Sequence, residues 1–284
     1  MKRLLDLAQE KNDLGVIVTI TSVFEGLASM RLGQIKNQVQ LSQAFFEELW
    51  HIYSQIRVDR TFRYGRETNE HVIDKELIIA ITAEGGFSGD IDQKLIEWML
   101  KEYNPEKQDI IIVGHHGALQ LVQAGVKFKK YFKLPARDQN INVTPLVQFV
   151  HEYRNTTVYY QTYVSLMVQD IKKIELRTAV QEAGRRLKEE EDTINEATYI
   201  FEPSTFAVVA HLERSMVEIA LSQTILESKL AQYASRFRSM NVANDKAAES
   251  QRLINLAYNR AKRATADERL KETINGIRQG AAVL

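Results

Sequence analysis

Two adjacent histidines between glycines, Gly114-His115-His116-Gly117, are the residues of this chain that most directly suggest chemistry. Imidazole nitrogens can bind a metal ion or act as a general base. Neighbouring side chains on an extended loop point to opposite sides, so the pair would seldom hold one ion together. No acidic residue lies nearby in the sequence to orient either ring. We therefore favour a loop that contacts a partner protein, with a metal or catalytic role as the alternative.

A second glycine-rich segment, Gly85-Gly86-Phe87-Ser88-Gly89, follows a predicted strand and precedes a predicted helix. The N-terminus of a helix attracts anions, so a phosphate-binding role has to be considered. The spacing matches neither G-x-G-x-x-G nor the Walker motif, and Asp90 and Asp92 would repel a phosphate. We interpret the segment as a tight turn between strand and helix, with nucleotide binding as the alternative.

Four lysines are interleaved with three aromatic residues in one short stretch: Lys127, Phe128, Lys129, Lys130, Tyr131, Phe132 and Lys133. Such a mixture also occurs in nucleic-acid binding proteins. The whole chain has 37 basic and 37 acidic residues, and its formal net charge of zero gives no general attraction to nucleic acid. We therefore expect a solvated strand, or a surface that faces an acidic partner, and no nucleic-acid partner.

The composition excludes several kinds of site. Cysteine is absent, which removes disulfides, thiolate catalysis and cysteine-based metal sites. Asp6, Glu10 and Asp13 interrupt the N-terminal segment, so no signal-peptide core is expected. No stretch approaches the roughly 20 apolar residues that are needed to span a bilayer. We expect no catalytic residues, no cofactor, no metal ion and no direct small-molecule substrate.

A long N-terminal helix is the first of the elements that must position these segments. From Leu4 to Ile56, a 3-4-3-4 spacing meets an apolar residue or a tyrosine at twelve of sixteen positions. Proline, which breaks helices, is absent before position 105. The polar exceptions are Lys11, Thr21, Glu25 and Ser42. Seven heptads of this kind predict a supercoiling helix about 80 Å long.

A second long helix is predicted at the C-terminal end of the chain. It begins after Glu202-Pro203-Ser204, where Ser204 is a candidate N-cap. The same spacing continues from Val209 to Ala261, and the polar exceptions are Gln223, Asn244 and Gln251. The full segment would be on the order of 120 Å long. Each helix has one apolar seam and no other partner in the chain, so the two are expected to pair.

The middle of the chain alternates between strand and helix signals. The segments 76–82 and 109–114 are apolar runs bounded by glycine, which is typical of strands buried on both faces. Helical spacing at 91–103 separates them and predicts a βαβ unit with a parallel sheet. Residues 145–153 look helical, and residues 157–175 have the composition of long strand material.

The predicted fold class is therefore mixed α/β, with a long antiparallel coiled coil of N- and C-terminal helices and a central Rossmann-like α/β domain. Three domains are expected. They are an N-terminal coiled-coil helix over residues 1–60, a central α/β domain over 61–200, and a C-terminal coiled-coil helix over 201–284.

Short motifs at matching positions along nearly the whole chain carry a family resemblance. The clearest is Tyr199-Ile200-Phe201-Glu202-Pro203-Ser204, at the entry to the last helix. Others are Val158–Ser165, Gly114–Gly117, and the set Leu256, Tyr258, Asn259, Arg260 and Ala261. Each motif alone is weak, but the ordered set resembles the gamma subunit of F-type ATP synthases.

This resemblance implies a non-catalytic central-stalk rotor. It would transmit torque between a membrane proteolipid ring and a hexamer of alpha and beta subunits, with an epsilon subunit beside it, for proton- or sodium-coupled ATP synthesis or hydrolysis. It also implies a peripheral position at the cytoplasmic face of a membrane, the inner or plasma membrane of a bacterium.

The resemblance further implies partner contacts at three places. Contacts near the ring would come from Tyr199, Phe201 and Glu202. Contacts along the shaft, near the mouth of the hexamer, would come from Arg236 and Met240. The region that meets the catch loops of the hexamer would hold Asp267, Glu268 and Arg269. Residues 266–270 depart from the usual family sequence, so the rotor of a specialised rotary ATPase not used for synthesis is an alternative. A free-standing coiled-coil adaptor and a small-molecule α/β enzyme are the others.

Overall fold

The computed structural model describes residues 4–56, 73–135, 141–185, 200 and 202–281. The chain divides into two compact units, Met1–Leu27 with Phe237–Leu284 (unit 1) and Ala28–Arg236 (unit 2). Two long helices, α1 (Leu4–Gln55) and α6 (Thr205–Ala281), contribute to both units. The division into domains at residues 60 and 200 stays a prediction.

Unit 2 is built on a five-stranded sheet with the strand order β3-β2-β1-β4-β5. The strands are β1 (Ile73–Ile81), β2 (Gln108–Val113), β3 (Lys130–Phe132), β4 (Tyr153–Tyr163) and β5 (Gln169–Glu175). The central strand β1 runs parallel to β2 and to β4, and β2 runs parallel to β3. The last five residues of β1 are all buried, which explains its continuous apolar run.

The prediction of long strand material over residues 157–175 is wrong in one respect, because a turn divides it. β4 and β5 form an antiparallel hairpin, with Tyr163 opposite Gln169. The turn is closed by the Ser165 N–H, which donates to the Val168 carbonyl at 2.8 Å, and by the Gln169 side chain, which donates to the Ser165 carbonyl at 2.9 Å. The segment 164–168 contains neither glycine nor proline, so the usual sequence signal for a turn is missing.

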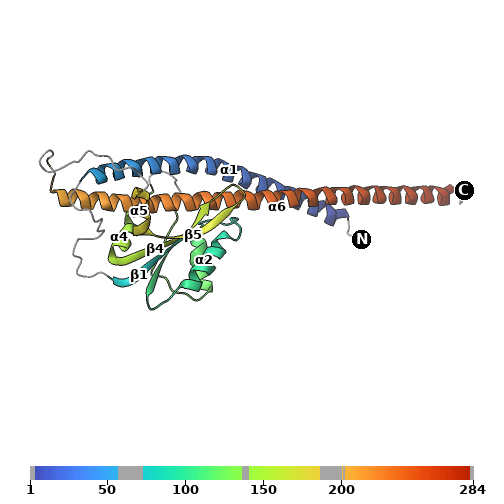
Figure 1. The fold of residues 1–284 in the computed structure, drawn as a ribbon. Helices are drawn as coiled ribbons and strands as arrows, with labels where there is room; N and C mark the ends of the chain where they lie inside the picture. The colour runs from blue at the N-terminus through green and yellow to red at the C-terminus, as the bar shows by residue number, and fades with distance from the viewer. Residues whose placement is uncertain (1–3, 57–72, 136–140, 186–199, 201, 282–284) are drawn as a thin grey trace. The chain divides into compact units, whose positions relative to one another are not determined.

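Helices cover both faces of the sheet (Figure 1). On one face, α2 (Ile91–Glu102) and α3 (His115–Gln123) pack through Leu95, Met99 and Leu121 against alternate residues of β1 and β2. On the other face, α4 (Thr144–Glu152), α5 (Leu176–Arg185), α6 and the end of α1 bury a second cluster. The mixed α/β fold class with a Rossmann-like middle is confirmed.

The start of α6 is capped as expected. The Ala207 N–H donates to the Ser204 hydroxyl oxygen at 3.2 Å, and the Val208 N–H donates to the Ser204 carbonyl at 3.1 Å. The first bond satisfies one of the N–H groups that a helix start leaves without an intrahelical partner, and the second is the first i→i−4 bond of the helix. Glu202 lies two residues before Ser204 and is exposed.

In unit 1, α1 and α6 form an antiparallel pair (Figure 1). Three of the polar interruptions in the α1 seam meet polar or aromatic groups on α6. The Thr21 hydroxyl lies 3.1 Å from Asn244 Oδ1, and the Asn241 amide donates to Glu25 at 3.1 Å. The ammonium of Lys11 lies 5.2 Å from the centre of the Tyr258 ring. A buried polar side chain costs little free energy when it meets its partner on the other helix, and much more when a shift of one helix along the other removes that partner. These contacts therefore help to fix how α1 and α6 are aligned in unit 1.

The opposite side of α1 in unit 1 is apolar and exposed. Val16, Ile20, Val23 and Leu27 lie at helical spacing on one face and are 57%, 47%, 56% and 48% exposed. By length and composition α1 is apolar enough to cross a membrane, with a mean hydropathy of 1.4 in its most apolar window. The expectation that no stretch qualifies is therefore wrong by this measure. The reason is that α1 carries two apolar faces and buries only one of them within unit 1.

Candidate functional site

The two histidines lie at the start of α3, so the expected extended loop is wrong. His115 is exposed, whereas the side chain of His116 is 31% exposed and turns toward α2. There His116 Nδ1 lies 3.1 Å from the Asp92 carboxylate. Asp92 is 24 positions away, so an inspection of nearby sequence could not find it as a partner.

The glycines around the histidine pair are required by the close approach of β1. Gly114 has φ +100°, and a Cβ there would lie 2.0 Å from the Thr82 carbonyl oxygen. A Cβ on Gly117 would lie 2.7 Å from the Thr82 side chain. The buried Thr82 hydroxyl accepts a hydrogen bond from the Gly117 N–H at 3.0 Å. The two glycines therefore allow the ends of β1 and β2 and the start of α3 to pack closely against one another.

Asp92 is the centre of a buried polar network. Its carboxylate is 2% exposed and accepts from the Gln161 amide at 2.6 Å and from the Ala83 N–H at 3.3 Å. Ser88 and His116 lie at 3.5 and 3.1 Å from the same carboxylate. These groups come from the end of β1, the β1–α2 turn, α3 and β4. The network extends to α6, since Gln161 also accepts from Ser228 and Gln232.

The β1–α2 turn, residues 82–90, is also held directly by α6. The Arg236 guanidinium donates from Nε to the Gly86 carbonyl and from Nη2 to the Gly85 carbonyl, both at 3.0 Å. The Ser235 hydroxyl donates to the Ser88 carbonyl at 2.6 Å. The turn therefore presents carbonyl oxygens to an arginine, where a phosphate-binding loop would present N–H groups to an anion. This geometry favours the structural interpretation of the glycine-rich segment.

Two electrostatic effects follow from this packing. The hydrogen bond to Asp92 raises the pKa of His116 above its ordinary value of 6.5, against an opposing effect of burial and of the Arg236 charge. Burial lowers the pKa of the Arg236 guanidinium. Arg236 also lies with its guanidinium carbon 5.0 Å from the centre of the Tyr233 ring.

The lysine-rich stretch ends in the short edge strand β3, and two of its lysines have partners within unit 2. Lys129 Nζ lies 2.8 Å from Asp109 and 2.7 Å from the Tyr153 hydroxyl, and these contacts raise its pKa. Lys130 lies 4.9 Å from the centre of the Phe149 ring. These lysines therefore help to hold β3 and β4 in place.

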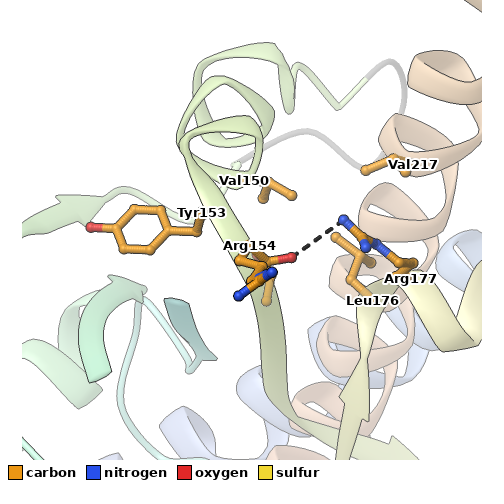
Figure 2. A pocket seen from close by; sticks show the side chains of 7 residues that line it. Val150, Tyr153, Arg154, Leu176, Arg177 and Val217 are labelled. Atoms are coloured by element: carbon orange, nitrogen blue, oxygen red, sulfur yellow. Dashed lines mark hydrogen bonds between the residues drawn. The ribbon is translucent and has the colours of Figure 1, made fainter. Parts of the chain in front are cut away.

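A hollow beneath β4 and α5 is too small for a substrate. It holds about 10 Å³, room for a single water molecule. Figure 2 shows the residues around it and the hydrogen bond from the Arg177 guanidinium to the Arg154 carbonyl at 3.3 Å. Within the described ranges, no three His, Asp or Glu side chains gather in a way that would hold a metal ion.

The structure places the expected partner-contact residues in different environments. Tyr199 and Phe201 lie outside the described residues. The residues that are exposed are Glu202, Asp267, Glu268 and Arg269. Met240 is 7% exposed and is buried in the helix pair of unit 1, while Arg236 is engaged with the β1–α2 turn. Whether any of them reaches a partner protein stays a prediction.

Sequence reasoning missed Asp92, Gln161 and Ser235 as members of one network. In the sequence alone, Asp92 stands out only as a group that would repel phosphate. One signal was available: a polar residue at an otherwise apolar position of the buried strand β4, Gln161, requires partners.

Comparison with protein families gives one match over residues 5–278, described as ATP synthase. The ATP synthase gamma chain of Chlorobium phaeobacteroides is 23% identical, over 97% of this chain and 98% of its own length. That of Geobacter metallireducens is 24% identical, over 90% and 91%.

Solved structures share the fold. The chain is similar to one in the OSCP, F1 and c-ring structure of the Euglena gracilis mitochondrial ATP synthase, with a TM-score of 0.63 and 14% identity over 96% of this chain and 93% of that one. A chain of the rotor structure of the same enzyme gives a TM-score of 0.60 and 15% identity, over 92% and 99%.

Proposed function

Because this chain belongs to the ATP synthase gamma-chain family, we propose that it is the central-stalk rotor of an F-type ATP synthase and carries no catalytic site of its own. In this role it transmits torque between a membrane proteolipid ring and a hexamer of alpha and beta subunits, with an epsilon subunit beside it. The coupled process is proton- or sodium-driven ATP synthesis, or the reverse hydrolysis. The proposed location is peripheral, at the cytoplasmic face of a bacterial plasma membrane.

The observation that carries this proposal is the exposed apolar stripe Val16, Ile20, Val23 and Leu27 on α1 of unit 1. It lies opposite the seam that packs on α6, so the helix pair is apolar toward its surroundings as well as inside. A helix that is apolar on both sides needs a second partner. A ring of subunits that encloses the shaft would supply one, and this is how the rotor would be held while it turns.

Rotation would act on the catalytic subunits through the asymmetry of the shaft. A pair of unlike helices offers a different surface to each subunit around it. Each subunit would then be shifted toward a different conformation, according to which face of the shaft it meets. The shaft needs stiffness for this and no reactive group.

The proposed rotor function also gives each of the expected partner-contact residues a place in the complex. Glu202, with Tyr199 and Phe201, would contact the ring. Arg236 and Met240 would lie near the mouth of the hexamer, where Arg236 acts by holding the β1–α2 turn. The region near the catch loops would hold Asp267, Glu268 and Arg269, whose exposure leaves them accessible to a partner.

A pull-down from native membranes tests the proposal. The tagged full-length chain should co-purify with Walker-motif alpha and beta subunits and with the proteolipid ring. A complex that hydrolyses ATP but cannot synthesise it would favour the specialised rotary ATPase. Recovery of coiled-coil partners without any nucleotide-binding subunit would favour the free-standing adaptor and contradict the rotor.

Charge reversal at Arg269 tests the catch assignment. Arg269→Glu should lower ATP-driven ion pumping in membrane vesicles by about fivefold, which corresponds to about 1 kcal/mol for an exposed ionic contact. The exposed Arg252, also on α6, supplies the matched control Arg252→Glu. Equal pumping by the Arg269 variant and the unmodified complex would rule out the catch assignment while leaving the rotor proposal intact.

A further inference from the structure

The β1–α2 turn is fixed from several sides, and among the described residues that hold it one, His116, can change charge near neutral pH. Its backbone carbonyls are bound by Ser235 and Arg236 of α6. Beneath it, the carboxylate of Asp92 binds the Ala83 N–H, the Gln161 amide and His116. Histidine is the side chain whose ordinary pKa lies closest to neutrality.

His116 is placed to sense the solution and to act on the buried network. Its ring is 31% exposed, whereas the Asp92 side chain on its inner side is 2% exposed. Its own backbone N–H donates to the Ala83 carbonyl at 3.0 Å, so the residue is tied to the end of β1 independently of its ring. A proton can therefore reach the ring from solvent, and its charge is felt by a carboxylate that solvent does not reach.

We propose that His116 is a pH-sensitive latch on the β1–α2 turn, in which protonation converts its hydrogen bond with Asp92 into an ion pair and holds the turn more tightly. A charge-assisted hydrogen bond is roughly twice as strong as a neutral one. Asp92 also anchors Gln161, which binds Ser228 and Gln232, so the tightening extends to α6. The latch lies entirely in unit 2 and is independent of the proposed rotor function.

Three charged groups face the imidazole. Asp92 of α2 and Glu84 of the turn favour its protonated form, and Arg236 of α6 opposes it. The hydrogen bond to Asp92 is the largest effect, and the result is a raised pKa. A group whose pKa is raised on folding stabilises the fold at low pH, and this contribution is lost as pH rises through the folded value. For His116 the loss begins near its ordinary value of 6.5 and extends above it.

Hydrogen exchange of the full-length chain at pH 6 and pH 8 tests the latch. After correction for the chemical exchange rate, we expect residues 83–90 to be about fivefold more protected at pH 6, the factor expected from a charge-assisted bond. His116→Gln should abolish this difference, and His116→Lys should keep high protection at both pH values. The adjacent exposed His115 gives the matched control His115→Gln, which should behave as the unmodified chain.

A titration by NMR of the histidine-labelled chain gives a second test that does not require a folded variant. The His116 resonance should titrate above 6.5 and should report on the same transition as the exchange of residues 83–90. A His116 pKa at or below 6.5, or an unchanged pH dependence in a folded His116→Gln chain, would overturn the latch.

Discussion

Glutamate at both Ile20 and Val23 is expected to abolish assembly of the chain with alpha and beta subunits, while the chain itself stays folded. The two side chains are 47% and 56% exposed and lie opposite the seam of unit 1, so charges there remain in water in the isolated chain. In the proposed complex they would be enclosed by other subunits. Burying an unpaired carboxylate costs several kcal/mol of free energy. The cost of burying two is therefore expected to exceed the free energy that the contact between the shaft and the surrounding subunits supplies.

The measurement is reconstitution with the alpha and beta subunits, followed by size-exclusion chromatography, with circular dichroism to confirm that the variant is helical. Ser22→Glu is the matched control, because Ser22 is exposed on the same helix but away from the apolar stripe. Normal assembly of the Ile20→Glu, Val23→Glu variant would show that the stripe stays in water. The main support for an enclosing ring of subunits would then be lost.

Alanine at Gly114 is expected to lower the free energy of unfolding of unit 2 by about 3 kcal/mol or more. Gly114 has φ +100° and ψ 141°, a conformation reached almost only by glycine. An added Cβ would also lie 2.0 Å from the Thr82 carbonyl oxygen, so the ends of β1 and β2 would have to separate. Urea unfolding followed by circular dichroism measures the change.

Gly125 provides the control for backbone strain without a steric clash. It follows α3, has φ +69°, and an added Cβ would meet nothing within 4 Å. Gly125→Ala should therefore cost only about 1 kcal/mol, the price of the left-handed conformation for a residue with a side chain. If the two variants lost equal stability, the close approach to Thr82 would not be the cause of the Gly114 requirement.

Local sequence signals are sufficient for the two long helices and the buried strands, but not for α3, α5 or the β4–β5 hairpin. Apolar spacing from Leu4 and from Val209 predicts both long helices, because each must bury one stripe of side chains along its length. The buried runs at 76–82 and 109–114 predict the parallel pair β1 and β2, since strands covered on both faces need no alternation. The hairpin after Tyr163 was missed because side-chain and backbone hydrogen bonds close its turn without glycine or proline.

The sequence by itself determined the fold class and the family, because periodicity and ordered motifs are properties of the chain taken one segment at a time. The tertiary structure alone decided what the histidine and glycine motifs are for. It brought Asp92, His116 and Gln161 together across the ends of three strands, and Arg236 onto the carbonyls of the turn. Contacts between residues 24 to 151 positions apart depend on the packing of the sheet against its helices, which no local pattern encodes.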